Sequence, residues 1–143
     1  MMELLFSLNV EDGWPPVSKE CLVVTKCSNG YRLEVPPFFI KDLSVGDVIS
    51  VELNEEGDVN NWMHVEKSAR TTIWIKVNGE GSIEDILRQM KKLECNIERF
   101  TEYNYFSVDV AEECEISSID DCIDSLNEEE VAVAFPSFRH DDD

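Results

Sequence analysis

Histidine and cysteine are the first side chains to consider as catalytic or metal-binding groups, and the chain contains two histidines and five cysteines. Neither His64 nor His140 lies near a serine or cysteine in a nucleophile motif such as G-x-S-x-G, so we expect no histidine general base. An odd number of cysteines without a C-x-x-C pair argues against a disulfide framework and against a zinc site. We interpret the cysteines as reduced core thiols: Cys21, Cys27, Cys95, Cys114 and Cys122.

Carboxylates are the most abundant reactive groups, with 31 acidic against 12 basic side chains and a formal net charge of -19. So many carboxylates prevent the assignment of a catalytic pair from spacing alone. A field of this sign repels nucleic acids and anionic membranes and attracts basic proteins, although it is also typical of a merely solubilising surface. We therefore predict a binding protein with no enzymatic activity, no cofactor and no metal.

The acidic residues are concentrated in the last third of the chain, where residues 111–143 hold twelve carboxylates and a single cation, Arg139. Six of them lie on and after a short helical pattern without a basic neighbour. We predict that these six bind the partner: Asp120, Asp121, Asp124, Glu128, Glu129 and Glu130. Two aromatic residues, Tyr103 and Tyr105, alternate away from the inward positions of a strand pattern and are predicted partner-binding residues as well. Alternatively, their face packs on the N-terminal module.

The N-terminal part, residues 1–69, is interpreted as a small all-β module. Leu4, Phe6, Leu8 and Val10 alternate on one face of a first strand, and Asn29-Gly30 is a strong hairpin signal. Five short strands separated by glycine, proline and acidic turns predict a small β-barrel or sheet.

The second part, residues 70–143, is interpreted as a ferredoxin-like α+β module with an acidic C-terminal tail that we expect to be solvated. Gly79 and Gly81 precede a helix that we expect to start at Ser82, which would cap it together with Asp85. A second helix is predicted to be capped by a serine at position 117 or 118, with acidic residues in its first turn. The predicted order β-α-β-β-α-β is that of the split βαβ sandwich, so the fold class is α+β.

The apolar runs are too short to cross a bilayer, and no basic flank precedes a hydrophobic segment at the N-terminus. With 143 residues and a hydrophobic content of 43%, the chain can bury a core without metals or disulfides. These features predict a soluble cytoplasmic protein.

Several short motifs follow one another in the N-terminal half: Asp12-Gly13-Trp14-Pro15-Pro16, Pro37-Phe38-Phe39 and Val45-Gly46-Asp47. In this order they resemble an uncharacterised bacterial family known as a domain of unknown function, over roughly residues 4–77. The resemblance implies, for some members, an immunity role beside polymorphic or contact-dependent toxins. It provides no catalytic residue, and the glycines and prolines also have a structural interpretation as corners of the β module.

Three functional hypotheses follow. The first is an immunity protein that binds a basic toxin domain, such as a nuclease or an ADP-ribosyltransferase, and occludes its active site. The second is a ligand-binding regulatory module, because ferredoxin-like domains resemble the ACT-like modules that bind amino acids at a dimer edge. The third is a nucleic-acid mimic whose carboxylates imitate phosphates.

Overall fold

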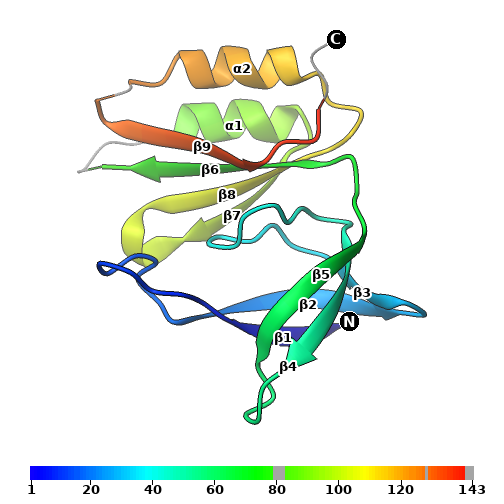
Figure 1. The fold of residues 1–143 in the computed structure, drawn as a ribbon. Helices are drawn as coiled ribbons and strands as arrows, with labels where there is room; N and C mark the ends of the chain where they lie inside the picture. Colours follow the sequence, from blue (N-terminus) through cyan, green and yellow to red (C-terminus); the bar gives the residue numbers. More distant parts are fainter. Residues whose placement is uncertain (79–82, 128, 141–143) are drawn as a thin grey trace. The chain divides into compact units, whose positions relative to one another are not determined.

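A computed structural model of the chain describes residues 1–78, 83–127 and 129–140 (Figure 1). The fold is α+β and consists mostly of strands, with two antiparallel sheets and, among the described residues, two α-helices. The chain divides into two compact units, Met1–Ser68 and Ala69–Asp143. Each unit has its own sheet and its own hydrophobic core.

The first unit is built from five strands joined in sequence order. These strands are β1 (Met2–Ser7), β2 (Lys19–Cys27), β3 (Gly30–Leu33), β4 (Val48–Leu53) and β5 (Val59–Glu66). Neighbours along the chain pair in antiparallel fashion, and β5 returns to β1 at one parallel pair, Phe6 with Val59. The predicted turn at Asn29-Gly30 joins β2 to β3 as a hairpin, because Cys27 pairs with Gly30.

Alternation along the strands of the first unit selects the side chains of its core. Leu4 and Phe6 of β1 are buried between exposed neighbours, as the sequence pattern predicts. They pack with buried residues of the other strands and of the long β3–β4 connection: Leu22, Val24, Leu33, Ile40, Leu43, Ile49 and Val59. The predicted alternation is wrong at Val10, which is 43% exposed, because β1 ends at Ser7 and the chain then enters a turn.

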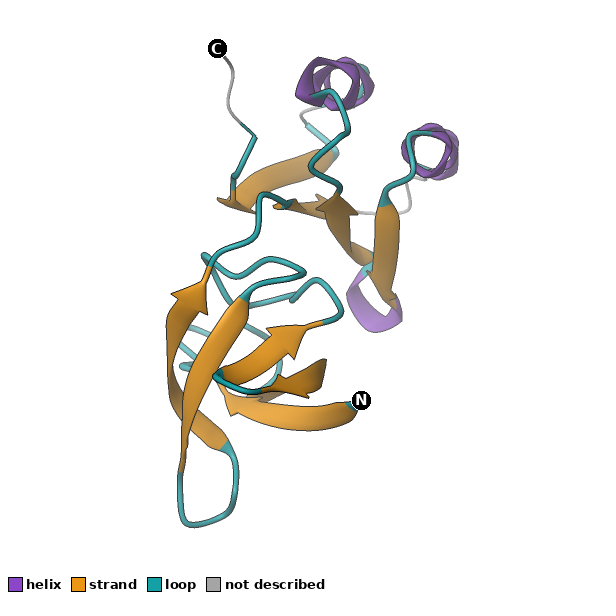
Figure 2. Cartoon of the chain, turned by 90° about the vertical axis from the view of Figure 1, so that its right-hand side faces the viewer, coloured by secondary structure: helices purple, strands orange, loops and turns teal. Residues whose placement is uncertain are grey.

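The second unit alternates strands and helices. Its elements are β6 (Thr71–Val77), α1 (Glu84–Lys92), β7 (Asn96–Phe100), β8 (Tyr105–Val110), α2 (Ile116–Asp124) and β9 (Val131–Ser137). The strands lie in the order β7-β8-β6-β9, and every pairing is antiparallel. Both helices cover the same face of this sheet (Figures 1 and 2).

The core of the second unit lies between this sheet face and the two helices. Helix α1 buries Leu87 and Met90, so the predicted apolar stripe is confirmed. On the sheet side the inward residues of β6 and β8 alternate as predicted: Ile73, Ile75, Val77, Phe106, Val108 and Val110. Helix α2 adds Ile119, which is fully buried.

The predicted starts of the helices are wrong. Helix α1 has Ile83 at its N-cap, with no side-chain cap, and the expected capping residue Ser82 lies outside the described residues, as do Gly79 and Gly81. Helix α2 starts at Ile116, one residue before the earlier of the two predicted serine caps, and its N-cap is Glu115. Its first turn consequently lacks acidic residues, and the carboxylates of α2 lie toward its middle and end.

The cysteines are free, but they do not share one environment. Cys95 and Cys122 are buried in the core of the second unit, and burial raises the pKa of the Cys95 thiol to about 12. Cys27 and Cys114 are half-buried, whereas Cys21 is exposed, so the expectation of five core thiols is wrong for Cys21. Among the described residues, neither helix combines the length and the hydrophobicity that crossing a bilayer requires.

Candidate functional site

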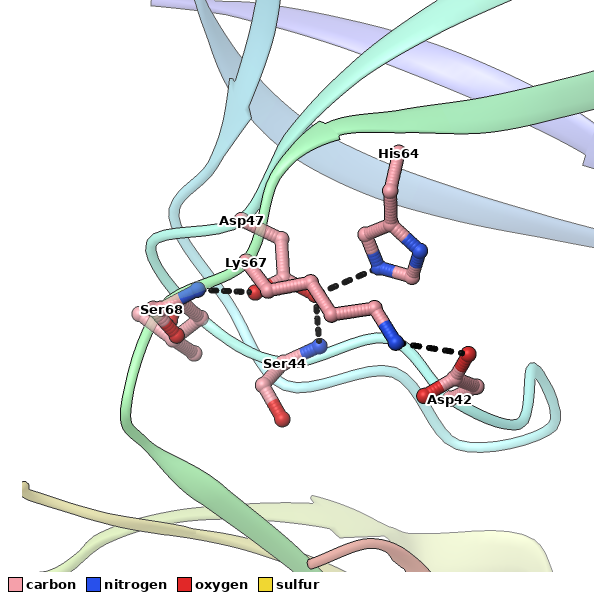
Figure 3. Close-up of polar contacts among 7 residues, drawn as sticks. Asp42, Ser44, Asp47, His64, Lys67 and Ser68 are labelled. Atoms are coloured by element: carbon pink, nitrogen blue, oxygen red, sulfur yellow. Dashed lines mark hydrogen bonds and ion pairs between the residues drawn. The ribbon is translucent and has the colours of Figure 1, made fainter. Parts of the chain in front are cut away.

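The first unit contains a polar centre around Asp47, whose side chain is completely buried (Figure 3). Its Oδ2 accepts the backbone N–H of Ser44 at 2.9 Å and lies 2.9 Å from Nε2 of His64. Its Oδ1 accepts the backbone N–H of Ser68 at 2.8 Å. Three segments are thus tied to a single carboxylate: the loop before β4, strand β5 and the residue at the end of the unit.

The hydrogen bonds of this centre have a structural role, because they hold three segments of the first unit together. A buried carboxylate is stable only when hydrogen bonds replace its lost hydration, and three donors do so for Asp47. The hydroxyl of Ser68 donates to the carbonyl of Val45 at 2.6 Å. In Figure 3 the second ring nitrogen of His64 points away from Ser44 and Ser68. The cluster therefore does not have the nucleophile–base–carboxylate geometry of a hydrolase.

A second buried carboxylate of the first unit belongs to Glu20, which is 6% exposed. Its two oxygens accept the backbone N–H groups of Phe38 at 2.6 Å and of Phe39 at 3.0 Å. Burial raises the pKa of Glu20 to about 7, and the two N–H donors offset part of that increase. Glu20 therefore anchors the segment that follows Pro37.

The three sequence motifs of the N-terminal half all lie in the first unit, and two of them are in contact. Trp14 packs edge to face on Phe39, with ring centroids 5.7 Å apart. Gly46 adopts a positive φ of 88° and donates its N–H to the carbonyl of Leu33, and this turn places Asp47 in the polar centre. Since Phe39 is itself held by Glu20, the motifs have a structural explanation in this unit.

The second unit contains a buried ion pair at the end of β8. Asp109, with a fully buried side chain, accepts two hydrogen bonds from Arg70, at 2.9 Å from Nε and 2.6 Å from Nη2. Asn96 adds a third donor at 2.9 Å. The hydrogen bonds to Asp109 raise the pKa of the Arg70 guanidinium, which is typical of a structural fork-to-fork pair.

The expectation of a solvated C-terminal tail is wrong at His140, which is 9% exposed. Its Nδ1 lies 2.6 Å from the hydroxyl of Thr71, and its Nε2 lies 2.7 Å from the carbonyl of Ala111. A carbonyl can only accept, so Nε2 carries the proton. His140 thereby fixes the end of the described chain to β6, and it is a packing residue; Asp141, Asp142 and Asp143 lie outside the described residues.

The predicted partner-binding carboxylates lie on α2 and just after it. Helix α2 turns Ile119 and Cys122 toward the core and leaves its acidic side chains exposed. The exposed carboxylates are Asp120, Asp121, Asp124, Glu129 and Glu130, which we call the α2 acidic surface; Glu128 lies outside the described residues. Among the described residues none of these five forms an ion pair.

The two predicted aromatic residues lie in different environments. Tyr103 is 42% exposed and stacks on Phe100, with centroids 5.6 Å apart and an interplanar angle of 25°. Tyr105 is only 4% exposed and contacts Trp74, so it offers little surface to a partner. Sequence reasoning missed the buried Glu20, Asp47 and Asp109, although the Gly-Asp motif marked the second of them.

Comparison with known proteins identifies the family. The family model described as "Domain of unknown function (DUF4265)" matches residues 20–134. The chain belongs to the DUF4265 family. The matched segment includes parts of both compact units, from β2 of the first into β9 of the second.

A solved structure has the same fold. It is described as "Novel crystal structure of a hypothetical protein from Neisseria gonorrhoeae", with a TM-score of 0.77 and 17% sequence identity over 99% of each chain. At this identity the similarity concerns the fold alone. No curated protein matches this DUF4265 chain.

Proposed function

We propose that this DUF4265 protein works by binding a basic protein, and that the partner is a bacterial toxin domain whose active site it occludes. The observation that carries the proposal is the α2 acidic surface. Its five carboxylates are exposed, and within the described parts of the chain no cation neutralises them.

The charge distribution gives this surface a physical role in association. Surface charges without local counter-ions act at a distance, and a net charge of -19 adds to their field. Such a field increases the rate at which a basic partner is captured more than it strengthens the final contacts. Toxins that act on nucleic acids have basic active-site clefts, so an acidic helix fits the occlusion of such a cleft.

Tyr103 is the aromatic residue that we propose as an anchor for the same partner. Its half-exposed ring is already stacked on Phe100, so binding would immobilise few additional rotamers. An anchor of this kind acts mainly on the dissociation rate.

The test is a charge reversal with a matched control. The test variant changes Asp120, Asp121 and Asp124 to lysine. The control changes the exposed carboxylates Glu52, Glu55 and Glu66 of the first unit to lysine, with an identical change in net charge. The partner is the toxin domain encoded by the adjacent gene, in an inactivated form.

We expect the test variant to associate at least about tenfold more slowly at low salt, with a flatter salt dependence, than the control. It should also lose protection of cells that express the toxin. Equal association rates for the two variants would contradict the proposal and direct the search to the surface around Trp14 and Phe38. An adjacent biosynthetic operon, with no toxin-sized reading frame, would contradict the immunity role.

A ligand-binding regulatory module is the second candidate, and the topology of the second unit favours it. We infer that this unit is a ferredoxin-like sandwich, because the sheet order β7-β8-β6-β9 with two helices on one face supports that assignment. We also infer that the first unit is a small barrel, since β5 returns to β1. A regulatory module would bind a small molecule, and calorimetry with amino acids tests this candidate directly.

A further inference from the structure

The cations of this acidic chain are unevenly placed in the second unit. Arg88 and Lys91 lie on successive turns of α1, and Arg99 lies on the neighbouring strand β7. All three line one pocket of about 250 Å³. A quarter of the chain's 12 basic residues therefore surrounds one small cavity in a protein that has 31 acidic residues.

The lining of this pocket combines charged and apolar side chains. Leu87 and Phe106, both nearly fully buried in the core, line it together with the half-buried Ile97. Cationic groups beside apolar side chains match a ligand that has an anionic head and a small apolar body.

Arg99 is held in place for recognition. Its guanidinium carbon lies 4.8 Å from the centroid of the Phe106 ring, a cation–π arrangement that restricts the side chain. The planar fork of a restrained arginine matches the oxygens of a phosphate or a carboxylate, and less ordering is lost on binding than for a free side chain.

The present partner of Arg99 is the carboxylate of Glu84, 2.5 Å from Nη2. This pair is exposed, with side-chain exposures of 45% for Arg99 and 56% for Glu84. An exposed pair of this kind contributes little to stability, so a ligand anion displaces Glu84 from Arg99 at little cost. Glu84 therefore acts as an internal substitute for the ligand's anionic group.

We propose that the pocket between α1 and β7 binds a small organic oxyanion, a phosphate monoester or a carboxylate that carries an apolar group. Arg99 and Lys91 bind the oxyanion, and the apolar side chains of the lining contact the body of the ligand. Arg88 lies at the rim, where it forms an ion pair with Asp85 at 3.2 Å. This binding is separate from the partner binding proposed for the α2 acidic surface.

The test uses the full-length protein and phenyl phosphate as the probe, with inorganic phosphate, benzoate and benzyl alcohol in parallel. Chemical shifts of the arginine and lysine side chains and of the α1 and β7 amides are followed by NMR. We expect saturable binding of phenyl phosphate or benzoate. The probe with the higher affinity shows whether the pocket prefers a phosphate or a carboxylate. Inorganic phosphate and benzyl alcohol, which each lack one half of the ligand, should bind at least about tenfold more weakly.

Variants locate the site. Arg99→Gln and Lys91→Gln should each weaken binding by about tenfold or more, because each removes a charge-assisted hydrogen bond. Lys92→Gln is the matched control, since Lys92 is the next residue of α1 and does not line the pocket. Glu84→Gln should strengthen binding by about two- to fivefold, because it removes a competing carboxylate. Arg99→Lys, which keeps the charge and loses the fork, should give an intermediate loss.

Three results would overturn the proposal: no saturable shifts with either aromatic anion, equal affinity for inorganic phosphate, or equal losses in Lys91→Gln and Lys92→Gln. Since Glu84, Lys91, Lys92 and Arg99 are all exposed, these variants should fold, and amide spectra check this directly.

Discussion

Replacement of Glu20 by glutamine gives the sharpest test of the buried chemistry of the first unit. In the folded protein the pKa of Glu20 is raised from 4.5 to about 7 by burial. Between those two pH values the unfolded chain has released the proton, whereas the folded protein still holds it. The free energy of unfolding must therefore fall as pH rises through this window. Below and above the window the ionisation of Glu20 causes no further change with pH, because the folded and unfolded states then have the same protonation.

The size of the effect follows from the two pKa values. Because one pH unit corresponds to about 1.4 kcal/mol, the difference between 4.5 and about 7 amounts to roughly 3 kcal/mol of unfolding free energy. Glutamine cannot ionise, and its side-chain oxygen can still accept from the backbone N–H of Phe38 or Phe39. The stability of wild type minus that of Glu20→Gln should thus decrease by about 3 kcal/mol between pH 4.5 and pH 7.5.

The assay is urea unfolding at a series of pH values, followed by tryptophan fluorescence. A Trp74→Phe background leaves Trp14 and Trp62, both of which belong to the first unit. Glu52→Gln serves as a control for the loss of one surface charge, since Glu52 is exposed on β4. A difference curve that is flat over this window, or that rises with pH, would refute the reasoning. If the glutamine variant does not fold, NMR titration of the glutamate carboxyl carbons must still show one group near pH 7.

Three further replacements test the packing and the polar contacts. Asp109→Ala removes a fully buried carboxylate that accepts from Arg70 and Asn96 and should cost about 3 kcal/mol in chemical unfolding; a loss below that of a single surface ion pair would contradict a buried role. Gly30→Ala places a Cβ 2.3 Å from the carbonyl oxygen of Ile49, so β4 must shift; we expect about 1 to 3 kcal/mol by the same measurement, and an unchanged midpoint would argue against the close approach. Met90→Ala removes a fully buried side chain and should cost about 2 to 5 kcal/mol in thermal unfolding, whereas an unaltered melting temperature would show that α1 is not packed on the sheet.

Local periodicity was sufficient for the elements of the fold. The side chains of a strand alternate between two faces, and those of a helix repeat every three to four residues, so a short stretch of sequence is enough to show which side chains point inward. This is why Leu4 and Phe6 in β1 and the apolar stripe of α1 were predicted correctly. Element ends were less accurate, because an N-cap depends on a single residue; α2 starts before the serines expected to cap it.

The sequence by itself determined the types of the secondary-structure elements and which faces of them point inward. It also determined the strongly negative charge and its concentration near α2. Only the tertiary structure decided which polar residues are buried. Glu20, Asp47 and Asp109 are three of 31 acidic residues that look alike in the sequence. Each has a donor that is distant along the chain, at Phe38, His64 and Arg70, which lie 18, 17 and 39 positions away. The burial of a carboxylate depends on whether distant donors meet it in the folded chain, and no local pattern records that meeting. The same holds for the pocket of Arg88, Lys91 and Arg99, which exists because α1 packs beside β7.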